Sequence, residues 1–157
     1  MSPVVRPFDP RDRDSIIALE AEIFRSDAWS PEVCALELQH PFSHYLVLEQ
    51  GAALVGYGGV RVPAPVGPGD IQTLAVHPDY RRAGWGRRIL NELVGHSIEK
   101  GVPELLLEVR ADNPSAQALY ESVGFREIAR RPNDYQPDGV DAMVMRLTLS
   151  VQRGGTR

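Results

Sequence analysis

The residues with the clearest chemistry form a glycine- and arginine-rich turn at residues 81–88, with the sequence RRAGWGRR. An apolar run at residues 71–76 precedes the turn, and a helical pattern that begins at Ile89 follows it. The first backbone N–H groups of a helix have no partner inside it and carry the positive end of its dipole, so phosphate is a natural ligand there. Gly84 and Gly86 let the backbone approach an anion closely. We therefore predict a pyrophosphate site at this turn.

Two common phosphate motifs do not match the turn. A Rossmann fingerprint requires a third glycine, and Ile89 stands at that position. A P-loop requires Gly-Lys followed by Ser or Thr, whereas Arg87 and Arg88 follow Gly86. Both the dinucleotide and the nucleoside triphosphate interpretations are weakened. A glycine-rich turn that binds nothing is the remaining structural alternative.

Length and composition indicate an ordinary globular protein. We expect one domain over residues 1–150 of the 157-residue chain and a flexible tail at residues 151–157. The net charge of −4 gives no general attraction to nucleic acid or anionic membrane. A single cysteine, Cys34, excludes a disulfide within the sequence and fits a reducing compartment. With no signal peptide or membrane-spanning run recognised, we expect a cytoplasmic protein.

The hydrophobic pattern predicts alternating strands and helices. Strands are expected at residues 4–8, 45–49, 53–62, 70–76, 104–110, 125–130 and 142–149, with loops at 63–69 and 132–139. Helices are expected around residues 16–24, from Ser30-Pro31 to about His40, from the glycine turn to about Lys100, and from Asn113-Pro114 to Gly124. This order predicts a mixed α/β fold with some parallel strand pairing.

The helix that begins at Pro31 has a predicted buried face and a predicted solvated face. We expect Val33 and Leu36 to point inward, with Cys34 as a small buried hydrophobic residue rather than a nucleophile. Glu32 and Glu37 are expected to face the solvent.

A second block of sequence makes the interpretation more specific. It contains LEVRADN at residues 107–113 and ALYESVGF at residues 118–125. With the Arg-x-x-Gly-x-Gly pattern of the turn, residues 4–149 resemble the GCN5-related N-acetyltransferase (GNAT) superfamily. LEVR and ALYES are similar, more narrowly, to RimI-type ribosomal-protein-alanine N-acetyltransferases. Those enzymes transfer acetyl from acetyl-CoA to the N-terminal alanine of small-subunit ribosomal protein 18.

The resemblance implies a fold, a cosubstrate and a set of site residues. The fold would be a mixed central sheet with splayed parallel strands flanked by helices, and acetyl-CoA would bind without a metal. Glu108 would be the general base and Tyr120 the general acid. The residues implied to contact acetyl-CoA are Leu74, Ala75, Val76, Arg81, Arg82, Ala83, Gly84, Trp85, Gly86, Arg87 and Asn113.

Acyl transfer to an amine is chemically compatible with these residues. An α-amino group has a pKa of about 7.7–8.0, against about 10.4 for lysine, so a carboxylate acting through water is a sufficient base. Glu108 lies in an otherwise apolar strand, where we expect burial to strengthen it as a base. A tyrosine hydroxyl can supply a proton or hydrogen bond to the leaving thiolate. The alternatives are a surface ion pair between Glu108 and Arg110, and a purely structural, core Tyr120.

The acceptor side is less defined by the sequence. We expect Glu20, Trp29 and Tyr135 to contribute to acceptor binding, with an exposed helix face as the alternative for Glu20. RimI-type sequences often carry two adjacent aromatic residues in the last loop, and here Asp134 replaces the first of them. This departure leaves the acceptor open.

Three functional hypotheses follow. The first is acetylation of a protein N-terminus, the ribosomal alanine in particular, by an enzyme whose partners are acetyl-CoA and a protein rather than nucleic acid or membrane. The second is a related acetyltransferase that acts on another N-terminus, a lysine or a small amine. The third is a non-catalytic CoA-binding module or an arginine-rich nucleic-acid binder, which the acidic net charge argues against.

Overall fold

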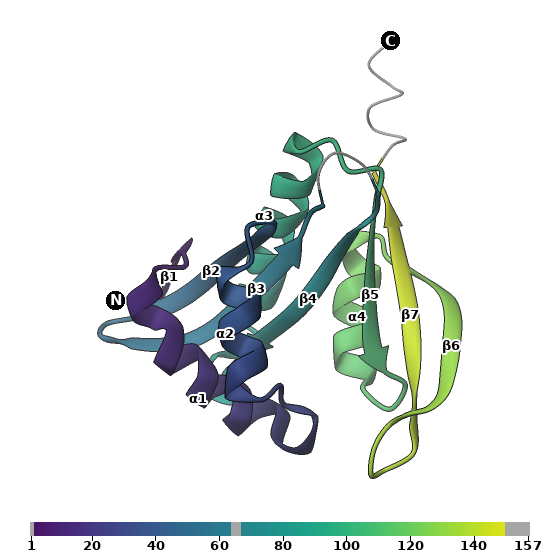
Figure 1. The fold of residues 1–157 in the computed structure, drawn as a ribbon, viewed down its shortest axis with the longest axis horizontal. Helices are drawn as coiled ribbons and strands as arrows, with labels where there is room; N and C mark the ends of the chain where they lie inside the picture. The colour runs from purple at the N-terminus through teal and green to yellow at the C-terminus, as the bar shows by residue number, and fades with distance from the viewer. Residues whose placement is uncertain (1, 64–66, 150–157) are drawn as a thin grey trace. The chain divides into compact units, whose positions relative to one another are not determined.

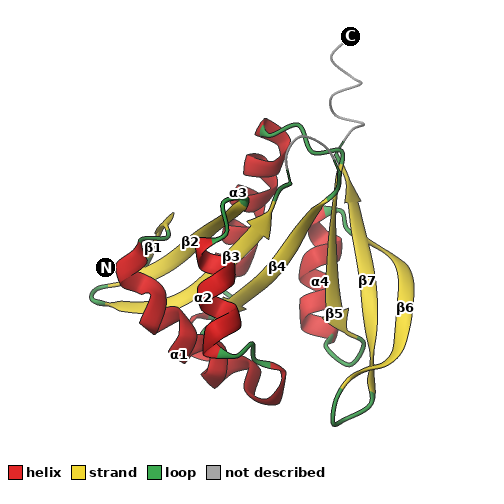
Figure 2. Cartoon of the chain, viewed as in Figure 1, coloured by secondary structure: helices red, strands yellow, loops and turns green. Residues whose placement is uncertain are grey.

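The structure, a computed structural model, describes residues 2–63 and 67–149. The strands are β1 (Val4–Pro7), β2 (Ser43–Gln50), β3 (Ala53–Arg61), β4 (Gly69–Val76), β5 (Glu104–Arg110), β6 (Arg126–Tyr135) and β7 (Val140–Thr148). The helices are α1 (Arg13–Phe24), α2 (Pro31–Gln39), α3 (Trp85–Glu99) and α4 (Pro114–Val123), with 3-10 turns at Pro10–Asp12, Arg25–Asp27 and Pro78–Tyr80. Figures 1 and 2 show these elements. None of the helices in the described residues is long and apolar enough to cross a membrane.

The strands form a mixed sheet, as predicted. Their hydrogen-bonded order is β1-β2-β3-β4-β5-β7-β6. β4 and β5 are parallel, with Gly69 opposite Leu105 and Asp70 opposite Leu106. The β1–β2, β2–β3, β5–β7 and β6–β7 pairs are antiparallel.

The chain divides into two compact units, and each is described by itself. The first comprises Met1–Arg61 and Ile71–Leu93, and the second comprises Val62–Asp70 and Val94–Arg157. One domain over residues 1–150 stays a prediction, and the predicted tail at 151–157 lies outside the described residues.

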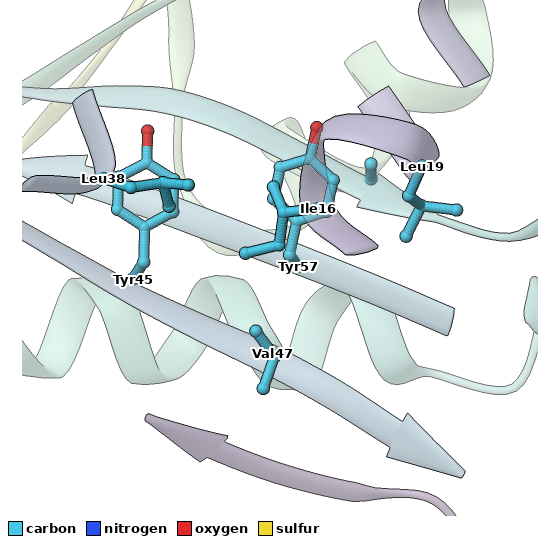
Figure 3. Close-up of a cluster of buried hydrophobic side chains, with 7 residues drawn as sticks. Ile16, Leu19, Leu38, Tyr45, Val47 and Tyr57 are labelled. Carbon is cyan, nitrogen blue, oxygen red and sulfur yellow. The ribbon is translucent and has the colours of Figure 1, made fainter. Parts of the chain in front are cut away.

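In the first unit, α1 and α2 cover one face of the β2–β3 hairpin. The register places Val47 opposite Tyr57, so these side chains and Tyr45 project from the same face. Ile16 and Leu19 from α1 pack against them in a buried cluster (Figure 3). The cluster also contains Leu38 from α2 and Ala75 from β4. This core fixes α1 and α2 against the strands.

Glycines in β3 allow close packing on both faces of the strand. A Cβ on Gly58 would lie 2.8 Å from Cγ2 of Ile89 in α3. A Cβ on Gly59 would lie 2.2 Å from the ring of Tyr45. Any side chain at these positions would therefore push α3 or the Tyr45 ring away.

Local capping residues set the helix ends as the sequence predicts. The Ser30 hydroxyl accepts a hydrogen bond from the Val33 N–H at 3.2 Å, and Asn113 Oδ1 accepts one from the Ala116 N–H at 3.1 Å. Gly124 ends α4 with a φ of 119°, a conformation that favours glycine. These helix boundaries are confirmed.

The predicted buried face of α2 is wrong. Val33 and Leu36 are 40% and 68% exposed, whereas Cys34 and Leu38 are buried. Positions four apart lie on the same side of a helix, so Cys34 and Leu38 form the inward face. Cys34 is buried as expected. Glu37 is not simply solvated, because its carboxylate pairs with Arg61 of β3.

The predicted loop at residues 132–139 is also wrong for its first half. β6 continues through Pro132 to Tyr135, and the connection to β7 spans only residues 136–139. β6 is the last strand in the sheet order, and an edge strand tolerates a proline because one side of it needs no ladder partner. A register shift between Arg131 and Tyr135 accompanies the positive φ of Asn133.

In the second unit, β5 alternates between a buried and a more open face. Leu105, Leu107 and Val109 are buried, and Tyr120 of α4 packs edge-on against Phe125 with ring centroids 5.9 Å apart. Glu108 lies on the opposite face of β5, since successive side chains alternate. The apolar face of this strand supports α4, and the other face carries the charges.

Candidate active site

The glycine turn connects β4 to α3 in the first unit. The Arg88 N–H donates to the Gly84 carbonyl at 3.0 Å, so Gly84 directly precedes the first helical turn. Gly84 has a φ of 86° and Arg82 a φ of 66°, both in the left-handed region. A Cβ on Gly84 would meet nothing within 4 Å, so the space beside this glycine is open. Glycine is needed at position 84 for its conformation rather than for packing.

The backbone donors of the turn are available to a ligand. Within the described part of the chain, the N–H groups of residues 82–87 donate to no protein acceptor. Arg82, Arg87 and Arg88 are exposed around them. Unpaired N–H groups at the start of a 15-residue helix, surrounded by guanidinium groups, are able to bind an anion.

Arg81 has a different position from the other arginines of the turn. Its Nε donates to the Val76 carbonyl at 2.8 Å, so the side chain ties the end of β4 to the turn. Ala75 and Val76 are themselves buried. Only their backbone groups are therefore placed to meet a ligand, and the cofactor contacts of residues 74–76 and 81 stay predictions.

Glu20 is a buried residue in the first unit, and the exposed helix face considered for it is wrong. The side chain accepts a hydrogen bond from the Tyr57 hydroxyl and another from the Trp29 N–H at 2.9 Å. Burial, followed by the Glu20 carboxylate, raises the pKa of Tyr57 above its usual range, so the hydroxyl stays a donor. Glu20 thus anchors the segment between α1 and α2 through the backbone of Trp29, whose own side chain is half-buried.

Glu108 in the second unit is not buried, contrary to the sequence-based expectation. Its side chain is 37% exposed, because it lies on the open face of β5, and it pairs with Arg131 of β6. The alternative pair with Arg110 is also wrong. The Arg110 guanidinium instead contacts Asp112 at 3.0 Å and Asp138 at 2.9 Å.

Tyr120 combines a packed ring with an available hydroxyl. Burial, and next the neighbouring Tyr135, raise the pKa of Tyr120 to about 12, so the hydroxyl is protonated at neutral pH. None of the hydrogen bonds found among the described residues uses this hydroxyl, while the ring packs on Phe125. The core interpretation is correct for the ring and leaves the hydroxyl free to donate.

Asn113 and Tyr135 complete the predicted residues of the second unit. Asn113 is exposed, and only its side-chain oxygen is used in capping α4. The Arg110 guanidinium lies over the Tyr135 ring, 5.2 Å from its centroid. The structure therefore holds Tyr135 by a cation–π contact and places it in the surroundings of Tyr120.

Three residues of these networks were not predicted from the sequence. Tyr57, Arg110 and Arg131 contact Glu20, Tyr135 and Glu108 respectively. No local pattern shows that Tyr57 contacts Glu20 or links Arg131 to a strand two places away in the sheet.

The part of the chain that the structure describes contains no group of three or more His, Cys, Asp or Glu residues placed to hold a metal ion.

Burial raises the pKa of the Cys34 thiol to about 11, so it is protonated at neutral pH.

Comparison with known proteins identifies the family. The model of the acetyltransferase (GNAT) family matches residues 13–125. The chain belongs to the GNAT family. It is 39% identical over 138 residues to the N-alpha-acetyltransferase RimI of Mycobacterium tuberculosis, covering 86% of this chain and 85% of that protein. The predicted family is confirmed.

Solved GNAT structures show the same fold. The ribosomal-protein-S18-alanine N-acetyltransferase of Escherichia coli matches with a TM-score of 0.84 and 32% identity, over 94% of each chain. The NatC complex bound to Gag peptide and CoA matches with a TM-score of 0.83 and 25% identity, over 95% of this chain and 99% of the matched chain. The predicted mixed-sheet acetyltransferase fold is confirmed.

Because Glu20 is buried and Glu22 is exposed, we expect their substitution by glutamine to affect stability differently. In Glu20→Gln, the amide oxygen can accept from only one of the two donors, so the bond to Tyr57 must reverse its direction or the bond to the Trp29 N–H is lost, and neither remaining bond is to a charged group. We expect a loss of about 1–3 kcal/mol in the free energy of unfolding, measured by urea denaturation. The Trp29 amide should also exchange faster with solvent.

Glu22→Gln is the matched control, because the Glu22 side chain is 62% exposed and, among the described residues, has His77 at 3.4 Å as its ion-pair partner. It should cost less than about 1 kcal/mol. Equal losses in the two variants would contradict the anchoring role of Glu20.

Proposed function

We propose that this GNAT protein transfers acetyl from acetyl-CoA to the α-amino group of a protein N-terminus, the N-terminal alanine of small-subunit ribosomal protein 18 in particular. The observation that carries the proposal is the similarity to RimI over 85% of that relative's length, and the ribosomal acceptor is suggested by the match to the ribosomal-protein-S18-alanine N-acetyltransferase of Escherichia coli. Glu108 on β5 and Tyr120 on α4 supply the chemistry that the reaction needs. A ribosomal acceptor would place the reaction in the cytoplasm.

The proposed donor site uses the backbone more than side chains. The unpaired N–H groups of residues 82–87 would hold the pyrophosphate of acetyl-CoA, with Arg82 and Arg87 adding charge. Backbone groups of residues 74–76 would bind the pantetheine arm, because the side chains of Ala75 and Val76 are buried. Asn113 would contact the cofactor through its amide nitrogen, since its oxygen caps α4. Arg81 would hold the turn against the end of β4 by its hydrogen bond to the Val76 carbonyl, and Trp85 would lie beside the cofactor.

The proposed reaction removes two protons from the acceptor nitrogen, one as the ammonium becomes a neutral amine and one after that amine has attacked. The neutral amine nitrogen attacks the thioester carbonyl carbon, the carbon–sulfur bond breaks, CoA leaves as a thiolate, and the nitrogen releases its second proton to water. Glu108 would take the proton of the ammonium directly or through water, and its exposure gives water access.

Tyr120 would stabilise the leaving thiolate by a hydrogen bond. A thiol has a pKa of about 8.5, whereas burial raises the pKa of Tyr120 to about 12. Complete proton transfer from this hydroxyl to the thiolate would be uphill by about 5 kcal/mol. A protonated donor without a protein acceptor instead offers a hydrogen bond to the charge as it develops.

For the acceptor we propose Glu20, Trp29 and Tyr135. Glu20 would act indirectly, by fixing the backbone at Trp29, and Tyr135 would present a ring held by Arg110. A second candidate function is acetylation of a different N-terminus, a lysine or a small amine. Asp134 supports this second candidate function, because RimI-type sequences often carry an aromatic residue at that position.

A panel of peptides tests the proposed function. Peptides that begin with Ala-Arg, Ser, Met or Gly, and one with a blocked N-terminus and an internal lysine, are incubated with the protein and acetyl-CoA. We expect acetylation of the Ala-Arg peptide at its α-amino group, measured by mass spectrometry, and none of the lysine. If another peptide is acetylated and the Ala-Arg peptide is left untouched, the ribosomal acceptor is wrong.

Glu108→Gln tests the proposed base. The amide accepts no proton from the ammonium, so we expect kcat for the preferred peptide to fall about 10²-fold while the affinity for acetyl-CoA is retained. Glu104→Gln is the matched control, because Glu104 lies on the same face of β5 and forms its own pair with Arg146 at 3.7 Å. Wild-type kcat in the Glu108 variant would refute the role.

Gly84→Val tests the anion site. A β-branched residue at a φ of 86° is strained by about 1–2 kcal/mol, and its side chain would enter the open space of the turn. We expect at least about a tenfold loss of CoA affinity in calorimetric titration. Gly51→Val is the control, because Gly51 also has a positive φ of 62° and open space, but lies in the β2–β3 hairpin. Equal CoA affinity in both variants would exclude the turn as the binding site.

A further inference from the structure

The proposed base has an unexpected partner within the second unit. Arg131 of β6 places its guanidinium against Oε2 of Glu108. The two strands are separated by β7, where Ala142 lies opposite both Arg110 and Arg131. Residues directly opposite each other in a sheet project from the same face, and Ala142 is small. The long Arg131 side chain therefore reaches along this face to Glu108.

The two side chains of the ion pair differ in how freely they can move. Glu108 projects from a strand that is paired with β7 over its whole length, whereas Arg131 lies on the edge strand and its side chain is 59% exposed. The Arg131 side chain contacts no other described residue by a hydrogen bond or an ion pair. Its guanidinium is thus able to leave Glu108 and enter the solvent without breaking another contact.

The pair occupies the position that an acceptor ammonium requires. A cationic amine approaches Glu108 only by displacing the guanidinium or by lying beside it, and two cations at one carboxylate repel each other. We propose that Arg131 is an acceptor-specificity residue that occupies Glu108 in the free protein and is displaced by the positively charged N-terminus of the acceptor. This inference rests on the proposed function, because it requires Glu108 to receive the acceptor amine.

The size of the effect follows from the exposure of the pair. Exposed ion pairs contribute about 0.2–1 kcal/mol, so Glu108 is accessible in only a fraction of molecules. An acceptor that needs the accessible form binds more weakly by the inverse of that fraction, which corresponds to at most about fivefold. A charged amine regains the lost attraction by pairing with Glu108 itself, whereas an uncharged molecule does not. Arg131 therefore weakens the binding of every acceptor that needs Glu108, and only an acceptor whose own positive charge pairs with Glu108 recovers the lost attraction.

Arg131→Gln tests this inference by steady-state kinetics with the Ala-Arg peptide. We expect the KM for the peptide to fall about two- to fivefold, with kcat and the KM for acetyl-CoA unchanged. Arg131→Lys keeps a competing cation and should retain a KM near that of the wild type. Arg130→Gln is the matched control, since Arg130 is the adjacent residue and pairs with Glu127 at 2.7 Å. It should leave all three constants unchanged.

A binding measurement separates this inference from the proposed function. The same peptide is titrated into CoA-saturated wild type, Arg131→Gln, Glu108→Gln and the double variant. We expect tighter binding from Arg131→Gln, by the same factor as in KM, and no further effect of that change when residue 108 is already Gln. Absence of acetylation in the wild type, with this binding pattern present, would overturn the proposed function alone.

Two results would overturn the role of Arg131. One is a binding result: the peptide binds Arg131→Gln no more tightly than it binds the wild type, or it binds none of the proteins. The other is a lower kcat at constant KM, which would mean that Arg131 orients Glu108 for the reaction instead of competing for it. Thermal unfolding of each variant checks that the exposed edge strand stays folded.

Discussion

The close approach of α3 to β3 is the constraint on which the proposed anion site depends. Gly58 leaves room for Ile89, and a Cβ would lie 2.8 Å from that side chain. Ile89 lies in the second turn of α3. The packing of this helix against the strand therefore determines the position of its first N–H groups. Cores are packed at the density of crystals and do not absorb an extra methyl group freely. A residue with no chemistry of its own thus positions the backbone donors of residues 82–87.

Features encoded within a few residues were predictable from the sequence. Ser30-Pro31, Asn113-Pro114 and Gly124 set helix ends because capping depends on neighbours three or four residues away. The strand–turn–helix order of the anion site is local in the same sense. β5 was predicted with the observed bounds, since its apolar run is dense. Motifs of this kind carry their own geometry.

Features that depend on which face is covered were not predictable. Alternation in LEVR tells which side chains share a face, but not that the face of Glu108 is open. The same limit made Glu20 appear to be a surface residue, although Tyr57, 37 residues away, completes its buried network. The inward face of α2 and the extension of β6 were missed because strand pairing and packing partners lie far away in sequence. The donor turn was therefore easier to infer than the acceptor residues.

The exposure of Glu108 bears on the kind of amine that the proposed enzyme accepts. An α-ammonium with a pKa near 8 is partly deprotonated at neutral pH, whereas a lysine near 10.4 costs about 3–4 kcal/mol more to deprotonate. The proposed base is a carboxylate that is 37% exposed and paired with Arg131. The hydrogen bond proposed from Tyr120 would assist the leaving group but not the amine. The chemistry on this face is therefore matched to an amine that loses its proton readily, and a protein N-terminus is such an amine.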